Sequence, residues 1–189
     1  MASSFKTHFA LISILLCGSV ASASAQATRH KSAVGPRGGI RSVTQTRGNG
    51  QFSGTRQAVG PNGGTYTNQR NVSAGQYSDT RTATGTNGAT RTTQKTVQNG
   101  ELSSTKTASG PNGATYTNQR TAGNGQYNDT RTATGPNGAT YESERTAEPG
   151  QLTSTKTAVG PKGGVYTDQR TVSNGQVTNT RTVTPAPQP

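Results

Sequence analysis

The chain of 189 residues has few of the residues that build reactive sites. Its single cysteine, Cys17, lies in the N-terminal segment, so the rest of the chain has no disulfide, no thiol nucleophile and no thiolate metal ligand. One histidine, His30, stands outside that segment, and the seven acidic residues do not recur as a constellation. Without a Ser-His-Asp set, a phosphate loop leading into a helix or clustered metal ligands, the sequence predicts no enzyme, no cofactor and no metal.

Large apolar side chains are equally scarce. After Gln26 there are fourteen Val, Ile, Leu and Phe residues and six Tyr. A composition this poor is typical of disordered chains and excludes a thick globular core. We expect order only from a regular array in which neighbouring units satisfy each other's backbone groups.

Residues 1–25 are predicted to be a signal peptide. Lys6 and His8 precede an apolar run at 9–17, and Ala23-Ser24-Ala25 gives a small-x-small cleavage pattern before Gln26. The run is too short to span a bilayer, although an uncleaved anchor is the alternative. Cleavage predicts a secreted or periplasmic bacterial protein that is associated with the cell surface.

The chain after residue 25 is strongly basic. It contains 18 basic and 7 acidic residues, which gives a formal net charge of +11. Such a chain attracts polyanions, namely acidic polysaccharide, lipopolysaccharide, anionic membrane or nucleic acid. Solubility alone is the alternative reason for the charge.

The remaining chain is a tandem array. A leader at 26–29 precedes 25-residue repeats over 30–184, and a Pro-rich tail follows at 185–189. Glycine is invariant at positions 6, 9 and 21 of every repeat, and no insertion breaks the spacing. The six repeats begin at His30, Thr55, Thr80, Thr105, Thr130 and Thr155, and a partial seventh begins at Thr180. A fixed period of this length indicates a repeat architecture.

The invariant glycines belong to two kinds of turn. Gly60-Pro61-Asn62-Gly63 is typical of a type I turn closed by a bulge, and Asn99-Gly100 is the favoured two-residue hairpin turn. The runs between the turns, such as 114–122, are rich in Thr and Tyr and alternate with period 2, which predicts strands. We therefore predict an all-β fold, a long antiparallel meander of about twelve short strands. A parallel β-solenoid is the alternative, which the tight Asn-Gly turns disfavour.

The two turns also predict the strand register. The first pairs repeat positions whose numbers sum to 16 and the second pairs positions that sum to 41, one period more, so the same positions stay in the same rows. On one face Asp79 is expected to oppose Lys95 and Asp129 to oppose Arg145, as ion pairs. The other face is expected to carry Thr and Gln. Open edges are expected at the strands that hold Thr55 and Val165.

Basic residues recur at two repeat positions on one predicted face, with tyrosines beside them. Arginine next to an aromatic ring is typical of sites for sugars, phosphates and bases. The alternative is a solvated face whose charges pair across the strands. The candidate polyanion-binding residues are Arg56, Arg70, Arg81, Lys95, Lys106, Arg120, Arg131, Arg145, Lys156, Arg170, Tyr66, Tyr116, Tyr141 and Tyr166.

The segment 150–154, Gly-Gln-Leu-Thr-Ser, runs into Gly160-Pro161-Lys162-Gly163-Gly164. This rhythm resembles the YD or RHS hairpin repeats of bacterial surface and toxin-delivery proteins over most of the array. The adjacent Tyr-Asp pair of those repeats is absent here, Tyr77-Ser78-Asp79 being the nearest, and the period is longer. The resemblance implies an envelope-exposed scaffold. The Gln, Asn and Gly usage also resembles that of curli-type amyloid repeats.

The sequence therefore favours an exported structural or adhesive repeat protein that binds anionic envelope or matrix polymers, such as acidic polysaccharide or lipopolysaccharide. Sequence-specific nucleic-acid binding is not expected, since no known module is present. One alternative is self-assembly into a matrix or fibrils through edge strands. Another is ice binding by Thr-x-Thr pairs such as Thr115 and Thr117.

Overall fold

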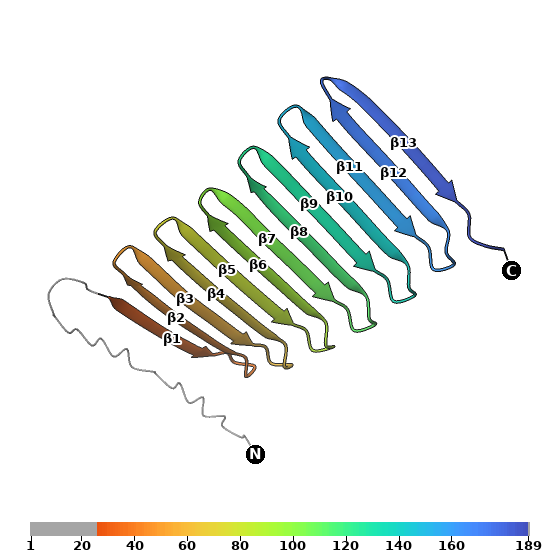
Figure 1. The fold of residues 1–189 in the computed structure, drawn as a ribbon. Helices are drawn as coiled ribbons and strands as arrows, with labels where there is room; N and C mark the ends of the chain where they lie inside the picture. Colours follow the sequence, from red (N-terminus) through yellow and green to blue (C-terminus); the bar gives the residue numbers. More distant parts are fainter. Residues whose placement is uncertain (1–25, 189) are drawn as a thin grey trace, which may run out of the picture.

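The computed structural model describes residues 26–188, and the predicted signal peptide lies outside this range. All regular structure between residues 26 and 188 is β: thirteen antiparallel strands follow one another in chain order in a single open sheet (Figure 1). The predicted antiparallel meander is confirmed, and the solenoid alternative is wrong. In the described part of the chain, no helix is long and apolar enough to cross a membrane.

The strands are short and nearly equal in length, nine residues in all but the first. They are β1 (Ala27–Val34), β2 (Ile40–Gly48), β3 (Gln51–Val59), β4 (Thr65–Ser73), β5 (Gln76–Thr84), β6 (Thr90–Gln98), β7 (Glu101–Ser109), β8 (Thr115–Gly123), β9 (Gln126–Thr134), β10 (Thr140–Glu148), β11 (Gln151–Val159), β12 (Val165–Ser173) and β13 (Gln176–Thr184).

Two expectations about the ends of the array need correction. Ala27 to Arg29, expected as a leader, are the first residues of β1, which raises the strand number from about twelve to thirteen. The strands that hold Thr55 and Val165 are β3 and β12, which pair on both sides, so the edges are β1 and β13. The predicted array begins at His30, whereas the observed pairing begins three residues earlier, with Ala27 to Val34 paired to Ile40 to Arg47.

The turns alternate between the two long sides of the sheet (Figure 1). In the loop between β3 and β4, Gly63 N donates to Gly60 O at 3.0 Å and Gly60 N donates to Gly64 O at 2.7 Å, the predicted bulge-closed turn. At the opposite side, Asn99 and Gly100 both have positive φ, 51° and 79°, as a type I′ turn requires. Only the glycine of Ala74-Gly75 and Pro149-Gly150 has a positive φ, which is the type II pattern.

The register is the predicted one. Val59 pairs with Thr65 across the first kind of turn and Ser73 with Gln76 across the second, so each repeat position keeps its row over the whole sheet. Successive residues of a strand point to opposite faces, and directly paired residues share a face. Every strand residue is thereby assigned to one of two faces.

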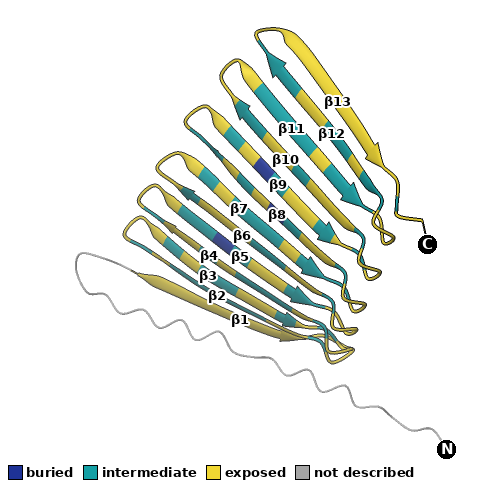
Figure 2. Cartoon of the chain, turned by 45° about the vertical axis from the view of Figure 1, so that its right-hand side comes forward, coloured by how far each residue is buried: buried dark blue, intermediate teal, exposed yellow. Residues whose placement is uncertain are grey.

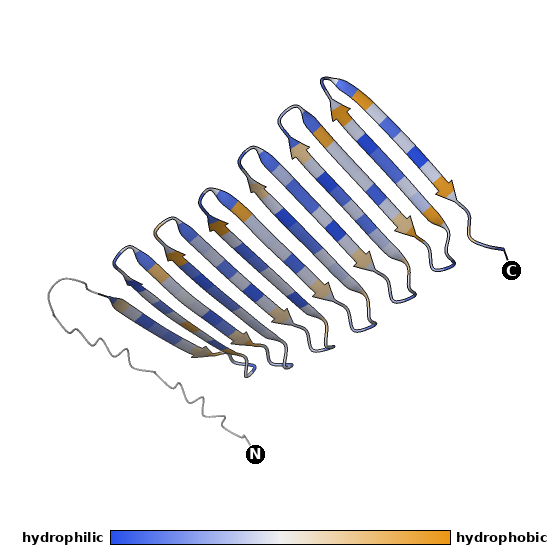
Figure 3. Ribbon diagram, in the orientation of Figure 1, coloured by the Kyte–Doolittle hydropathy of each residue, from blue (hydrophilic) through white to orange (hydrophobic). Residues whose placement is uncertain are grey.

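The sheet is a single layer. Among residues 26–188 no hydrophobic side chain is buried, and the only buried residues are Asp79, Asn118 and Asp129 (Figure 2). Apolar residues lie near the strand ends, whereas the middles of the strands are hydrophilic (Figure 3). The sheet is therefore held by backbone pairing and cross-strand side-chain contacts, with polar groups in its best-covered places.

Candidate functional site

Strand alternation gathers the basic side chains on one face, which we name the cationic face. It carries sixteen of the nineteen Lys and Arg residues of the chain and all three aspartates, a formal charge of +13. Lys6 lies outside the described residues, and Arg37 and Lys162 lie in loops. Sixteen cations on one side of a single layer produce a strong positive field in front of it.

The opposite face, named the Thr/Gln face, carries the four glutamates and, among the strand residues that the structure describes, no Lys or Arg. Thr67, Thr82, Thr92 and Thr107 are consecutive members of one of its rows. The Thr-x-Thr pairs of the sequence, including Thr115 and Thr117, lie on this face. The two faces therefore differ in the sign of their charge.

All fourteen predicted site residues lie on the cationic face, in three rows that cross the strands. The first row holds Arg70, Lys95, Arg120, Arg145 and Arg170 on even-numbered strands. The second holds Arg56, Arg81, Lys106, Arg131 and Lys156 on odd-numbered strands. The third, nearer the glycine-proline loops, holds Tyr66, Tyr116, Tyr141 and Tyr166.

Asp79 in β5 is the centre of a polar cluster that the sequence did not reveal. Its Oδ2 accepts from Arg81 Nη2 at 2.6 Å and from the Tyr77 hydroxyl at 3.3 Å, and its Oδ1 accepts from Asn68 Nδ2. Arg70 Nη2 lies 4.0 Å from Oδ2. The carboxylate is covered, with Asp79 4% exposed, whereas the Arg81 side chain is 49% exposed.

The pKa of Asp79 follows from these contacts. Burial of the carboxyl would by itself raise the pKa, but the hydrogen bonds from Arg81, Asn68 and Tyr77 and the charge of Arg81 outweigh it and hold the pKa below its ordinary value. Asp79 therefore stays ionised at neutral pH and fixes the position of the guanidinium beside it.

The same cluster recurs fifty residues later in β8 and β9. Asp129 accepts from Arg131 Nη2 at 2.6 Å and from Tyr127 at 3.3 Å, Asn118 donates to its other oxygen, and Arg120 Nη2 lies 3.6 Å away. Burial would raise the pKa of Asp129, but the hydrogen bonds from Arg131 and Asn118 lower it more. Two clusters with the same contacts show that the arrangement recurs with a spacing of two repeats.

A third cluster has the two polar residues exchanged. Asp168 in β12 occupies the position of Asn118, and Asn179 in β13 occupies that of Asp129. Arg181 Nε lies 3.3 Å from Asp168 Oδ1, and in the amide orientation that satisfies both groups Asn179 Nδ2 donates to the same oxygen at 3.0 Å. Single aspartates thus recur in equivalent polar clusters, which the sequence analysis did not predict. The signal was a 50-residue spacing, two repeats, which a search at 25 residues passes over.

The predicted ion pairs across the strands need a second correction. Asp79 is paired with Lys95 in register, as is Asp129 with Arg145, yet the ion pairs of both aspartates in the described chain are with the arginines two residues ahead and on the preceding strand. Among the predicted site cations, those without an ion pair within residues 26–188 are Arg56, Lys95, Lys106, Arg145, Lys156 and Arg170.

The aromatic rings that contact cations are not the ones predicted. Arg70 lies over Tyr77 and Arg120 over Tyr127, each 5.7 Å from the ring centroid, and Lys95 Nζ lies 5.9 Å from that of Tyr77. The predicted Tyr116, Tyr141 and Tyr166 are 38–39% exposed beside the cation rows. Tyr77 and Tyr127 therefore orient cations, whereas the three exposed tyrosines offer ring surface to a ligand.

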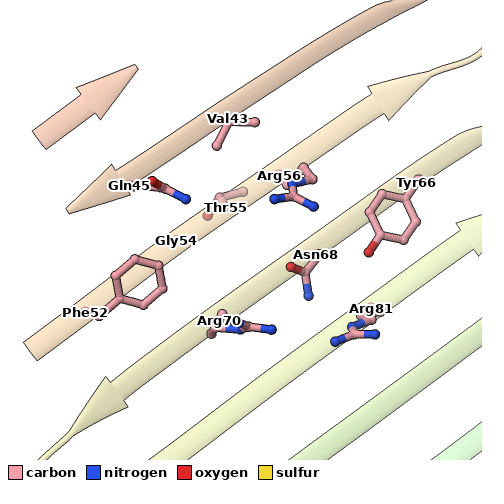
Figure 4. A pocket seen from close by; sticks show the side chains of 10 residues that line it. All are labelled: Val43, Gln45, Phe52, Gly54, Thr55, Arg56, Tyr66, Asn68, Arg70 and Arg81. Atoms are coloured by element: carbon pink, nitrogen blue, oxygen red, sulfur yellow. The ribbon is translucent and has the colours of Figure 1, made fainter. Parts of the chain in front are cut away.

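One shallow hollow lies on the cationic face at Gly54 in β3 (Figure 4). Its volume is about 200 Å³, and Phe52, Tyr66, Arg56 and Arg70 are among its lining residues. A Cβ at Gly54 would lie 2.9 Å from Phe52 Cζ, and the same repeat position holds serine in β7 and β11. The missing side chain thus opens a recess lined by two aromatic rings and by the guanidiniums of Arg56, Arg70 and Arg81.

Comparisons of the chain with models of protein families, with curated proteins and with solved structures gave no match.

Proposed function

We propose that the protein is an exported structural or adhesive repeat protein whose cationic face binds anionic polymers of the cell envelope or of an extracellular matrix, such as acidic polysaccharide or lipopolysaccharide. The observation that carries the proposal is the separation of charge: +13 on one face against four glutamates on the other. A globular protein that uses charge only for solubility has no need to sort it in this way.

The shape of the face supports a polymer as ligand. Thirteen strands about 4.8 Å apart and about 30 Å long form a surface roughly 60 Å by 30 Å. The hollow at Gly54 is open to solvent, whereas small-molecule sites are enclosed and mostly apolar. A flat, basic and periodic surface suits a ligand that is itself extended and periodic.

The test is retention of the purified protein on an immobilised acidic polysaccharide at increasing salt. Because each neutralised anionic group releases counterions, retention should fall steeply with salt. Binding that is unchanged between low and high salt contradicts the proposal.

A matched pair of variants separates the face from net charge. Arg145→Gln with Lys156→Gln removes two cations of the face, and Arg37→Gln with Lys162→Gln removes two cations of the loops. The first variant should elute at clearly lower salt and the second close to the unmodified protein. Equal shifts would show that net charge alone is responsible.

Self-assembly into a matrix is the second candidate, favoured by the single layer. Both faces of the sheet lack a covering layer within residues 26–188, and β1 and β13 each have one unpaired side. Open edges are templates for pairing with another chain. A protein that stays monomeric in light scattering at high concentration and gives no cross-β reflections would exclude this function.

A further inference from the structure

The two rows of cations on the cationic face are offset by one strand. The first row uses even-numbered strands from Arg70 in β4 to Arg170 in β12, and the second uses odd-numbered strands from Arg56 in β3 to Arg181 in β13. From β3 to β13 each strand therefore contributes one cation to these two rows. We name this set of eleven cations the zigzag.

The zigzag has a direction and a spacing. Neighbouring strands lie about 4.8 Å apart, so its eleven cations extend over about 50 Å across the strands. A polymer lying along a single strand would meet one cation of the zigzag, whereas a polymer lying across the strands meets all of them. The long axis of the sheet is thus the direction in which a linear polyanion is neutralised most completely.

Two of the three aspartates of the cationic face are covered and do not interrupt this surface, whereas the Asp168 side chain is 19% exposed. Asp79 and Asp129 are each 4% exposed, while the side chains of Arg81 and Arg131 are 49% and 47% exposed. The carboxylates lie beneath the guanidiniums and hold them, so a ligand approaching from solvent meets the cations. Holding a side chain before binding lowers the entropy that binding costs.

The spacing selects the class of polymer. Because single bonds are about 1.5 Å long, one 1,4-linked pyranose ring advances a chain by about 5 Å, close to the strand spacing. In a polysaccharide with one acidic group on each ring, the spacing of the acidic groups is therefore close to the strand-to-strand spacing of the zigzag cations. Duplex DNA, with one charge per about 1.7 Å of axis, does not.

We infer that the cationic face takes a single linear acidic polysaccharide that lies across the strands, with about one acidic sugar per strand from β3 to β13. Carboxylates would pair with the arginines and lysines of the zigzag, since guanidinium and carboxylate form the strongest charge-assisted contacts. The exposed rings of Tyr116, Tyr141 and Tyr166 lie beside the path for the sugar rings. This inference rests on the proposed function.

The first experiment measures affinity for oligouronates of 4, 8, 12 and 16 sugars by titration calorimetry. Affinity should rise at each step up to about 12 sugars, the length of the zigzag, and change little from 12 to 16. A plateau already at 4 sugars would overturn the inference, as would tighter binding of a single-stranded oligonucleotide with 12 phosphates. In both outcomes salt-dependent retention would survive, so failure here is distinct from failure of the proposed function.

The second experiment breaks the zigzag in its middle. Lys95→Gln with Lys106→Gln removes the cations of β6 and β7 and leaves six consecutive ones from β8 to β13. Affinity for the 12-sugar chain should fall on the order of tenfold, because its two halves are no longer bound as one ligand, and affinity for a 5-sugar chain by less than about threefold. The loop variant with Arg37→Gln and Lys162→Gln is the control with equal charge.

Equal losses for the two lengths would overturn the inference, because they would show that the cations act as separate sites. Lys95→Arg with Lys106→Arg should bind the 12-sugar chain like the unmodified protein, which excludes a loss of fold as the cause. A strand signal in circular dichroism that matches the unmodified protein verifies this for the glutamine variant.

Discussion

At the scale of single residues, the covered carboxylates of Asp79 and Asp129 position the arginines of the cationic face. Each accepts hydrogen bonds from an asparagine, a tyrosine and an arginine in a sheet with no buried hydrophobic side chain among its described residues. Because the chain has too few apolar residues for a core, hydrogen-bonded charged groups occupy the best-covered places of the sheet. The hydrogen bonds to each carboxylate fix the geometry of the side chains around it, although Arg70 Nε and Arg120 Nε are buried without a partner among residues 26–188.

The first prediction concerns acid. The pKa of Asp79 and of Asp129 is lowered on folding, so their contribution to stability is present above the unfolded pKa of about 3.9 and is lost as pH falls through the lower folded pKa. The midpoint of thermal unfolding should be nearly constant above about pH 5 and should fall below about pH 4. Circular-dichroism melts between pH 2 and pH 8 measure this.

Asp79→Asn with Asp129→Asn should lower the stability at pH 7 by roughly 1–2 kcal/mol per site, since the arginines are half exposed and screened by solvent. The same substitutions should flatten the acid limb of the melts. Glu142→Gln with Glu144→Gln on the Thr/Gln face is the matched control. An acid limb that the aspartate variant leaves unchanged would assign the pH dependence to other groups.

At the scale of strands and turns, the sequence was sufficient for the register because the turns are local. Two glycine-bearing turns at constant spacing determine which positions pair, and Asp79 does face Lys95 in register as predicted. The side-chain contacts could not be predicted from the sequence in the same way. Asp79 has a cation on each neighbouring strand and one two residues ahead, and only three-dimensional geometry shows that Arg81 and Arg70 are its partners.

The second prediction concerns the weakest repeat. In the third repeat Thr86 replaces the turn proline and Arg91 replaces the tyrosine, facing Ala83 and Ala108. Arg41 also stands at a tyrosine position, but its loop keeps Pro36. Loss of the proline costs about 0.4–1 kcal/mol through the unfolded chain, and the missing ring removes apolar contact. In an array with nearest-neighbour coupling the weakest unit opens first.

Limited proteolysis should therefore cut first between Thr86 and Lys95 and leave a C-terminal fragment that holds the last three repeats. Thr86→Pro with Arg91→Tyr should suppress that cut. Mass spectrometry of the early fragments identifies the site. Cleavage spread evenly over all repeats would mean that the chain is not a cooperative folded array.

At the scale of the whole molecule, one sheet both holds the fold together and presents the charged surface. A globular protein divides these two tasks between its core and its surface. The repeat gives each strand the same alternation, so the thirteen strands sort their charged residues onto opposite faces without a buried apolar core among residues 26–188. The basic rows were evident from the sequence, because their period equals that of the repeat. The clusters that organise them were missed because their period is twice as long.

The central claim is that the cationic face, and not the Thr/Gln face, contacts an acidic polymer. Nuclear magnetic resonance titration with a 12-sugar oligouronate tests it directly, since the two faces carry different reporters. We predict that the Arg side-chain N–H signals and the Tyr ring signals shift and saturate together, while the threonine methyl signals of Thr82, Thr92 and Thr107 stay in place. Shifts centred on those threonines, or spread equally over both faces, would contradict the account.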